Sequence, residues 1–274
     1  MKDVVIVDSV KYLFLEQLWA YYDQDGRHDL PWRSPQPDGS FTPYHILVSE
    51  LMLQQTQVNR VIQKYRPFLE RFPTVTALAR AELGEVLRLW QGLGYNRRAK
   101  YLWQAARAID SLGRFPDSSA GLTALPGVGV NTAGAIQAYA FNQPALFVET
   151  NIRTVYIHHF LPKVEAISDS VIRSLLEQTI DTERPREFYW ALMDYGSGLK
   201  RNIRTNTQSK HYARQTKFEG SRRQVRGQIL RALTSGSLSR AELANRIADK
   251  RLDDVLMALQ GEGLVVKKGA KYQL

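Results

Sequence analysis

The 274-residue sequence contains no cysteine. It therefore cannot form disulfides, thiolate zinc sites or cysteine-ligated iron–sulfur clusters. It also lacks an apolar run near the roughly 20 residues that a membrane span needs. The N-terminal residues 1–10 include a short apolar stretch but no signal-peptide cleavage site. We therefore expect no membrane association and a cytoplasmic protein.

Positive charge is in excess. The chain has 37 Lys and Arg against 27 Asp and Glu, a formal net charge of +10. Such a field favours a polyanionic partner, and nucleic acid is the commonest one. The hydrophobic content of 44% is ordinary for a globular protein. We expect a monomer that binds double-stranded DNA and is associated with the nucleoid.

Helical periodicity dominates residues 1–199, which we expect to form one all-α domain. Val10, Leu13, Phe14, Leu18 and Tyr21 are the predicted core face of a first helix that ends near Gly26. Residues 31–42 are rich in Pro and Gly and predict a loop. Pro43 begins a helix predicted to reach about Arg60. Further helices are expected at about 61–71, 75–80, 82–91, 96–112, 119–123, 130–140, 149–160, 167–179 and 184–198.

Residues 200–226 change in character, because nine basic side chains are opposed by one acid, Glu219. We interpret residues 200–221 as a basic connector that is irregular before Ser221. Two interpretations stay open: a solvated linker, and an arm that contacts DNA phosphates through Lys210 and Arg214.

Residues 222–274 predict a separate small α+β domain. Helices are expected at Arg222–Leu233, at Ser239–Ile247 with Ser239 as N-cap, and at Leu252–Gln260. A β-hairpin turning near Gly269 follows. This order is typical of a winged helix. Asp253 and Asp254 on its third helix would repel phosphate, so a protein-docking or purely stabilising role is an equal alternative.

The segment Leu125-Pro126-Gly127-Val128-Gly129, here called the hairpin loop, lies between two predicted helices. Glycine accepts positive φ and lets the backbone approach a ligand closely. The amides of the following turn, at Asn131 and Thr132, would point at an anion that the helix dipole favours. A DNA phosphate fits there. Taken alone, the segment is also compatible with an ordinary helix–helix turn.

With its flanking motifs, the hairpin loop resembles the helix-hairpin-helix DNA glycosylases related to endonuclease III, and within them the MutY-type adenine glycosylases. The resemblance covers about residues 10–199. It implies a mainly α fold of two helical subdomains, to which the winged-helix-like domain is appended. The motifs that carry it are Leu30-Pro31-Trp32-Arg33, Ser49-Glu50-Leu51-Met52-Leu53-Gln54-Gln55-Thr56-Gln57, Arg71-Phe72-Pro73-Thr74-Val75, Leu89-Trp90-Gln91-Gly92-Leu93-Gly94-Tyr95 and Met193-Asp194-Tyr195-Gly196.

The resemblance implies two working carboxyl groups. Glu50 matches the general acid that protonates the departing base, and its apolar neighbours Ile46, Leu47, Leu51 and Leu53 would raise its pKa. Glu149 stands where the family has an aspartate that faces the oxocarbenium ion, and Asn151 matches the family's asparagine. The longer Glu149 is compatible with a working stabiliser, with a different substrate, or with weak catalysis. We favour the first two together.

Other roles also come from the resemblance. Bifunctional relatives carry a lysine where this chain has Asn131, and an amide cannot form a Schiff base, so a monofunctional enzyme is expected. Trp32, Arg33 and Asn131 would lie at the base pocket. Core packing is the alternative for Trp32 and Tyr95. The expected DNA contacts are Gln55, Thr56, Tyr95, Leu125, Gly127, Val128, Gly129, Asn131, Thr132, Lys210 and Arg214.

Two parts of the family pattern are missing: the four cysteines of the iron–sulfur cluster, and the C-terminal domain that recognises 8-oxoguanine. We expect no cofactor, although hairpin-loop carbonyls could hold a monovalent cation. The predicted function is base-excision-repair hydrolysis of the N-glycosidic bond of a flipped base, adenine opposite 8-oxoguanine or guanine first. The alternatives are thymine or uracil opposite guanine, a modified base, or a non-catalytic DNA-binding protein.

Overall fold

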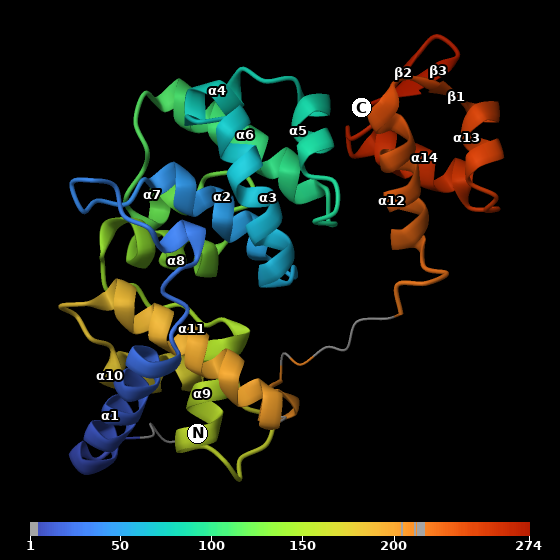
Figure 1. Ribbon diagram of the computed structural model, residues 1–274. Helices are drawn as coiled ribbons and strands as arrows, with labels where there is room; N and C mark the ends of the chain where they lie inside the picture. The colour runs from blue at the N-terminus through green and yellow to red at the C-terminus, as the bar shows by residue number, and fades with distance from the viewer. Residues whose placement is uncertain (1–4, 204, 211, 213–216) are drawn as a thin grey trace. The chain divides into compact units, whose positions relative to one another are not determined.

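The computed structural model describes residues 5–203, 205–210, 212 and 217–274 (Figure 1). They form two compact units, each built from separate stretches of chain. Within the described residues, the first unit comprises 5–46, 117–124 and 128–212, and the second comprises 47–116, 125–127 and 217–274. The domain bounds 1–199, 200–221 and 222–274 remain a prediction.

The first unit is helical. Helix α9 packs against α11, and α11 also contacts α1 and α8. Its helices are α1 (Asp8–Asp25), the start of α2 (Pro43–Leu53), α7 (Ser119–Thr123), α8 (Val130–Phe141), α9 (Thr150–Phe160), α10 (Asp169–Thr179) and α11 (Pro185–Asn202). The expected all-α character is confirmed, and Pro31–Arg33 adds a 3₁₀ turn within the predicted loop.

The predicted core face of α1 was partly wrong. Phe14, Leu18 and Tyr22 are buried, whereas Val10 and Leu13 are 42% and 54% exposed. The buried residues recur every four positions, the spacing that keeps side chains on one helical face. The centroid of the Phe14 ring lies 5.1 Å from that of the Phe160 ring at the end of α9, so this face of α1 packs on the first unit. Tyr21 is half-buried beside Tyr195.

The second unit contains the end of α2, α3 (Val58–Arg71), α4 (Val75–Ala79), α5 (Leu83–Leu89) and α6 (Arg97–Leu112). The predicted helix from Pro43 to Arg60 was wrong, because α2 ends at Leu53 and residues 54–57 form a turn. Arg98 of α6 explains this end. Its Nη1 donates to the carbonyls of Leu51 (2.6 Å) and Met52 (2.9 Å), which the last turn of a helix leaves without intrahelical partners.

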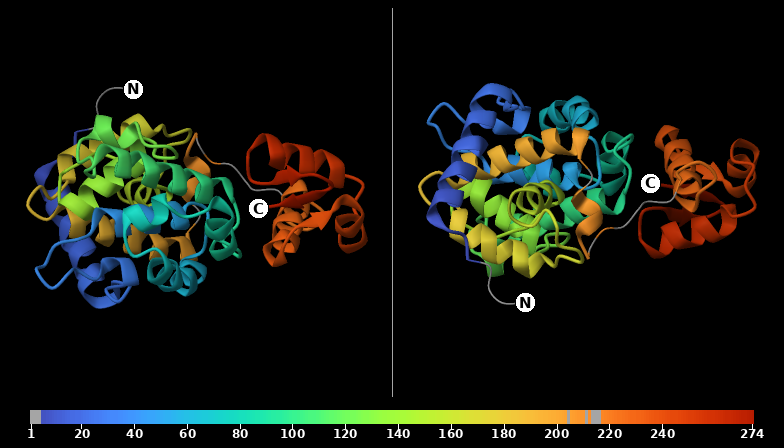
Figure 2. Two further views of the ribbon diagram at one scale, coloured as in Figure 1. Left: turned by 90° about the horizontal axis from the view of Figure 1, so that it is seen from above. Right: turned by 90° about the horizontal axis from the view of Figure 1, so that it is seen from below.

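Residues 222–274 form three helices with a small antiparallel sheet, drawn in orange to red in Figure 2. The expected helices and hairpin are confirmed, and β1 is an added strand in a sheet of order β1-β3-β2. Ser239 and Glu242 make the reciprocal bonds of a capping box. The elements are α12 (Arg222–Ala232), β1 (Leu238–Ser239), α13 (Arg240–Arg246), α14 (Leu252–Gly261), β2 (Val266–Lys268) and β3 (Lys271–Gln273).

The basic connector is more regular than expected. Lys200 and Arg201 complete α11, and Thr205–Gln208 form a 3₁₀ turn. Ile167 donates its amide to Gln208 and accepts one from Lys210, which fixes this stretch to the first unit. The expectation of an irregular chain was therefore wrong for residues 200–202 and 205–208, and the backbone of Lys210 is held by the loop before α10. Arg214 lies outside the described residues.

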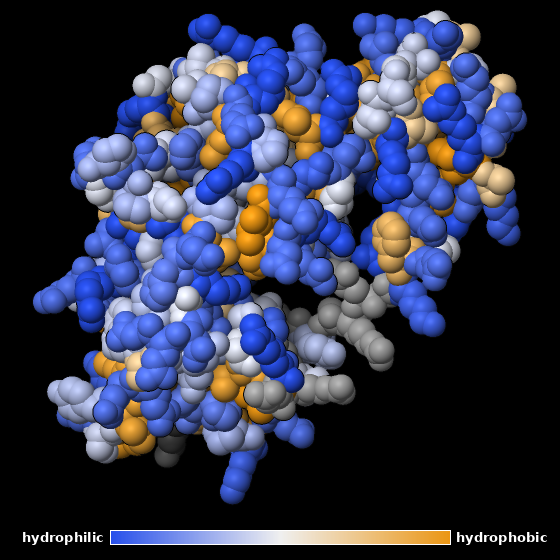
Figure 3. All heavy atoms as spheres, in the orientation of Figure 1, coloured by the Kyte–Doolittle hydropathy of each residue, from blue (hydrophilic) through white to orange (hydrophobic). Residues whose placement is uncertain are grey.

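Hydrophilic side chains cover most of the face drawn in Figure 3. Over the part of the chain that the structure describes, no helix combines the length and apolarity of a membrane span.

Candidate functional site

Glu149 occupies the N-cap position of α9. Burial raises the pKa of its carboxyl, while the positive charges of Arg153 and Lys200 lower it and leave a net rise. One turn further along α9, the Arg153 guanidinium is fixed by two bonds to Asp169, Nε to Oδ1 at 2.5 Å and Nη2 to Oδ2 at 2.8 Å. Glu149 is therefore a half-buried carboxyl whose charge depends on nearby cations.

Asn151 lies on the same turn, and α11 holds both ends of its amide. Its Nδ2 donates to the Met193 carbonyl at 3.1 Å, and its Oδ1 accepts from Lys200 Nζ at 2.9 Å. A Cβ at Gly196 would collide with the backbone carbonyl of Asn151. Only glycine therefore allows α9 and α11 to approach this closely.

Asn131, in the first turn of α8, holds the chain that leads into Glu149. Its Nδ2 donates to the Val148 carbonyl at 3.0 Å, and its Oδ1 accepts from the Val148 amide at 3.3 Å. This paired contact resembles a rung of a β-ladder. Asn131 thus fixes the backbone next to Glu149, a role that the sequence analysis did not anticipate.

Arg33 and Trp32, expected at a base pocket, are both buried. The Arg33 guanidinium makes a bidentate pair with Asp194, Nη1 to Oδ2 at 2.7 Å and Nη2 to Oδ1 at 2.9 Å. Arg27 adds bonds from its amide and its Nε to the same carboxylate. Burial raises the pKa of Asp194, but hydrogen bonds and charge from the two arginines outweigh it and lower the pKa overall. The hydrogen-bonding capacity of Arg33 is largely committed to this cluster.

In the second unit, the turn at 54–57 and the turn at 93–95 each contain a residue in the left-handed region: Gln55 (φ 54°) and Tyr95 (φ 47°). Non-glycine residues seldom adopt this conformation, and it clusters at functional sites. Gln55 is exposed and Tyr95 is 38% exposed. Both of these expected DNA contacts thus lie at strained turns.

Arg98 joins these two turns, and the sequence analysis missed it. Its Nη2 donates to Thr56 Oγ1 at 3.0 Å and to the Gly94 carbonyl at 2.9 Å. Its side chain is buried, and burial lowers its pKa to about 10. The only local sign of this residue is the Arg97-Arg98 pair at the start of α6. Its role as a link between the two turns depends on contacts with residues distant in sequence, such as Thr56.

The hairpin loop needs glycine at one of its two glycine positions. Gly127 has φ 78°, and a Cβ there would lie 2.5 Å from Tyr101 Cβ. Gly129 has an ordinary φ of −86° and space around it. Leu125 and Val128 are buried, and Thr132 is 9% exposed. The tolerance of glycine for positive φ is therefore needed at Gly127 and not at Gly129.

We expect Gly127→Ala to lower the free energy of unfolding by about 2 kcal/mol or more, from left-handed strain and the clash with Tyr101. Urea denaturation measures this loss. Gly129→Ala is the matched control, and its cost should stay below about 1 kcal/mol. Equal losses in the two variants would contradict the assignment.

Glu50 lies on the last full turn of α2 and is half-buried. Its neighbours Ile46, Leu47 and Leu51 are buried, as expected, and Leu53 is partly exposed.

The predicted site residues are divided between the two units. The first unit contains Glu149, Asn151, Asn131, Trp32 and Arg33, and the second contains Glu50, Gln55, Thr56 and Tyr95.

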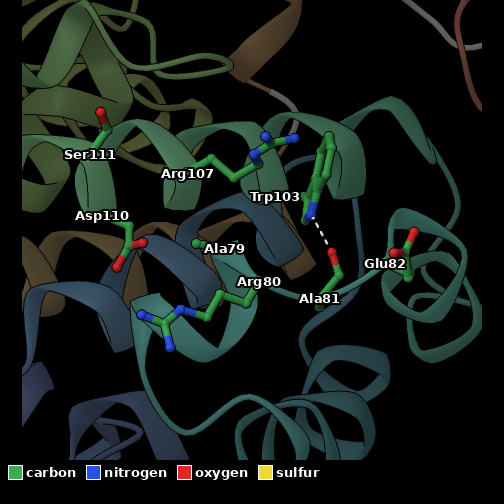
Figure 4. A pocket seen from close by; sticks show the side chains of 8 residues that line it. All are labelled: Ala79, Arg80, Ala81, Glu82, Trp103, Arg107, Asp110 and Ser111. Carbon is green, nitrogen blue, oxygen red and sulfur yellow. Dashed lines mark hydrogen bonds between the residues drawn. The ribbon is translucent and has the colours of Figure 1, made fainter.

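A metal centre and a surface hollow are two further kinds of site that other residues could form. Within the described ranges, no three His, Asp or Glu side chains are grouped as metal ligands. A surface hollow in the second unit is lined by Trp103, whose Nε1 donates to the Ala81 carbonyl at 2.8 Å (Figure 4). Arg80, Arg107 and Asp110 also line it, but none of the predicted site residues does.

Comparison with known proteins places these residues in context. Residues 48–180 match the model of the HhH-GPD superfamily base excision DNA repair protein. The chain is 34% identical over 284 residues to the adenine DNA glycosylase of Mycolicibacterium smegmatis, covering 91% of each protein. It is 36% identical over 202 residues to the adenine DNA glycosylase of Buchnera aphidicola subsp. Baizongia pistaciae, covering 71% of this chain but 55% of that protein.

Among solved structures, the chain is similar to a thermostable thymine-DNA glycosylase, with a TM-score of 0.60 and 25% identity. The match covers 69% of this chain and 87% of that one. Relatives such as the Buchnera protein extend well beyond the aligned part, since this chain spans about half their length.

Proposed function

We propose an activity for this chain on the premise that it belongs to the HhH-GPD superfamily of base excision DNA repair proteins. It is a DNA glycosylase that hydrolyses the N-glycosidic bond of adenine mispaired in duplex DNA. The observation that carries this proposal is the likeness to an adenine DNA glycosylase along 91% of both chains. Glu50, Glu149 and Asn151 supply the groups that such a reaction needs.

In the proposed reaction the adenine nucleotide leaves the base stack, and the exposed Gln55 and Tyr95 contact the space it vacates. Glu50 protonates the base, which becomes a better leaving group. The carboxylate of Glu149 stabilises the positive charge that develops on the sugar. Burial raises the pKa of Glu149, and the positive charges of Arg153 and Lys200 favour its ionised form.

A panel of labelled duplexes tests the substrate. Each duplex contains one candidate: adenine opposite 8-oxoguanine, adenine opposite guanine, thymine or uracil opposite guanine. We expect alkali-labile abasic sites at the adenine duplexes first. Release of thymine or uracil alone would favour the rival substrate, and no release despite tight DNA binding would indicate a non-catalytic binder.

We also propose that the enzyme is monofunctional. Asn131 replaces the Schiff-base lysine of bifunctional relatives, and its amide is held by the Val148 backbone. Borohydride should therefore trap no covalent protein–DNA complex on a duplex whose base is released. A trapped complex would contradict this, and repeating the assay with Lys200→Met would identify whether that amine forms it.

We propose that residues 222–274 are a winged helix that contacts DNA through its β2–β3 hairpin. Lys267, Lys268 and Lys271 are exposed there, whereas Asp253 of α14 pairs with Arg240. Replacing the three lysines with alanine should reduce the salt dependence of DNA binding by up to about 0.9 per lost phosphate contact. An unchanged slope would leave the unit a stabilising or protein-docking role.

We infer that the protein acts as a monomer on the DNA of the nucleoid, a polyanion that its net charge of +10 favours.

A further inference from the structure

The last turn of α11 brings an amine to the first turn of α9. Lys200 is exposed along much of its side chain, but its Nζ donates to Asn151 Oδ1 at 2.9 Å. Lys200 has no part in the reaction as described so far. Its contact is with the asparagine two residues beyond Glu149.

The geometry of Asn151 shows what this bond does. Met193 accepts from one end of the amide and Lys200 donates to the other, and both residues belong to α11. A donor at Oδ1 and an acceptor at Nδ2 permit one orientation of the amide plane. Without Lys200, the Met193 carbonyl alone would oppose rotation of the amide.

The charged groups around Glu149 also include Lys200. On α9, Arg153 forms a bidentate pair with Asp169 of α10, so its charge is largely balanced. His158 and His159 are at the other end of α9. On α11, Asp194 is engaged by Arg27 and Arg33. Within the described part of the chain, Lys200 makes no ion pair within 4 Å.

Lys200 and Glu149 act on each other electrostatically. Burial lowers the pKa of Lys200, and the charge of Glu149 opposes this. Conversely, burial raises the pKa of Glu149, and the charges of Arg153 and Lys200 oppose it. Arg153 has the larger effect of the two and is paired with Asp169, whereas Lys200 adds a second positive charge from α11.

We propose that Lys200 is a positioning residue for base excision: its bond from α11 fixes the amide of Asn151 and brings a positive charge to the first turn of α9, where Glu149 is the N-cap. The inference rests on the proposed role of Glu149 in the reaction. Lys200 itself contacts neither base nor sugar in this scheme, and it acts through its two neighbours on α9.

The test uses Lys200→Met, which removes charge and donor, and Lys200→Arg, which keeps both. Arg201→Met is the matched control, because it removes one charge from the same turn of α11. In the free protein, ¹³C NMR of labelled glutamate follows the titration of Glu149, assigned by the resonance lost in Glu149→Gln. Single-turnover release of adenine is measured across pH with the same variants.

We expect Lys200→Met to move the titration midpoint of Glu149 to higher pH and the acid limb of the rate profile with it. At pH 7 the rate should fall by about 10- to 100-fold, the range for a displaced catalytic group. Lys200→Arg should restore the midpoint and much of the rate, and Arg201→Met should change neither. Lys200→Gln provides a second neutral variant should the methionine lower the melting temperature.

An unchanged midpoint in both neutral variants would overturn the inference. The two proposals can fail separately, because the NMR titration needs no substrate. If the wild-type protein releases no base but the midpoint shifts as expected, the proposed function fails and the electrostatic coupling stands. If base release is normal and insensitive to Lys200, the positioning role fails and the proposed function stands.

Discussion

Glu50→Gln is expected to lower the rate of base release by about 10²- to 10⁴-fold, the usual contribution of a general acid. Glutamine keeps the size and polarity of the side chain, but its amide is not acidic enough to transfer a proton to the base. The substitution leaves the buried neighbours of Glu50 on α2 unchanged, so the fold of this helix should be kept. The affinity for duplex DNA should therefore stay within about twofold of the wild-type value.

Single-turnover kinetics on an adenine-containing duplex measures this effect, because product release then does not limit the rate. Glu70→Gln is a suitable control, since Glu70 is an exposed glutamate on α3. Its rate should equal that of the wild type. A Glu50→Gln enzyme as fast as this control would remove Glu50 from the reaction.

Asp194→Asn should lower the free energy of unfolding by about 3 to 5 kcal/mol, the usual cost of breaking a buried ion pair. The Asp194 side chain is fully buried and that of Arg33 is 4% exposed, so the arginine would keep a buried charge without its counter-ion. Urea denaturation at pH 7 measures the loss. Asp253→Asn is the control, because its pair with Arg240 is largely exposed, and breaking it should change the free energy of unfolding far less than Asp194→Asn does.

The Asp194 effect should also depend on pH. The pKa of Asp194 is lowered in the folded protein, so its contribution is present above the pKa of an unfolded aspartate and is lost as pH falls through the folded value. The stability difference between wild type and Asp194→Asn should therefore shrink in acid. A difference that stayed constant down to pH 2 would show that Asp194 stabilises by packing and not by charge.

Much of the helical fold could be predicted from sequence, because apolar periodicity and caps are local signals. Ser239 is an example, since its capping box needs only residues three positions apart. The failures had non-local causes. The left-handed turn at Gln55 that follows α2 is marked by neither Gly nor Pro. The last carbonyls of α2 are bonded by the guanidinium of Arg98, 46 residues beyond Met52. On α1, apolar side chains occur on more than one face, and packing against α11 and against the aromatic rings of α9 buries one of them.

In the candidate site, too, local motifs could be predicted and long-range contacts could not. Glu149, Asn151 and Glu50 could be identified because short motifs carry them. The supporting residues could not. Lys200 lies 49 positions from the asparagine it contacts, and Arg33 lies 161 positions from Asp194. Spacing in sequence carries no information on such pairs, which form only when the helices pack.

The Arg27–Asp194 contact has a consequence for synthesis of the protein. Its partners are 167 residues apart, and α1 depends on α11 for its packing. A ribosome adds about 5 to 20 residues per second, so the emerged N-terminal helix waits roughly 8 to 33 s for its counterpart. During that interval Phe14 and Leu18 are exposed on the nascent chain. Chaperones that bind apolar segments have their longest opportunity at this helix.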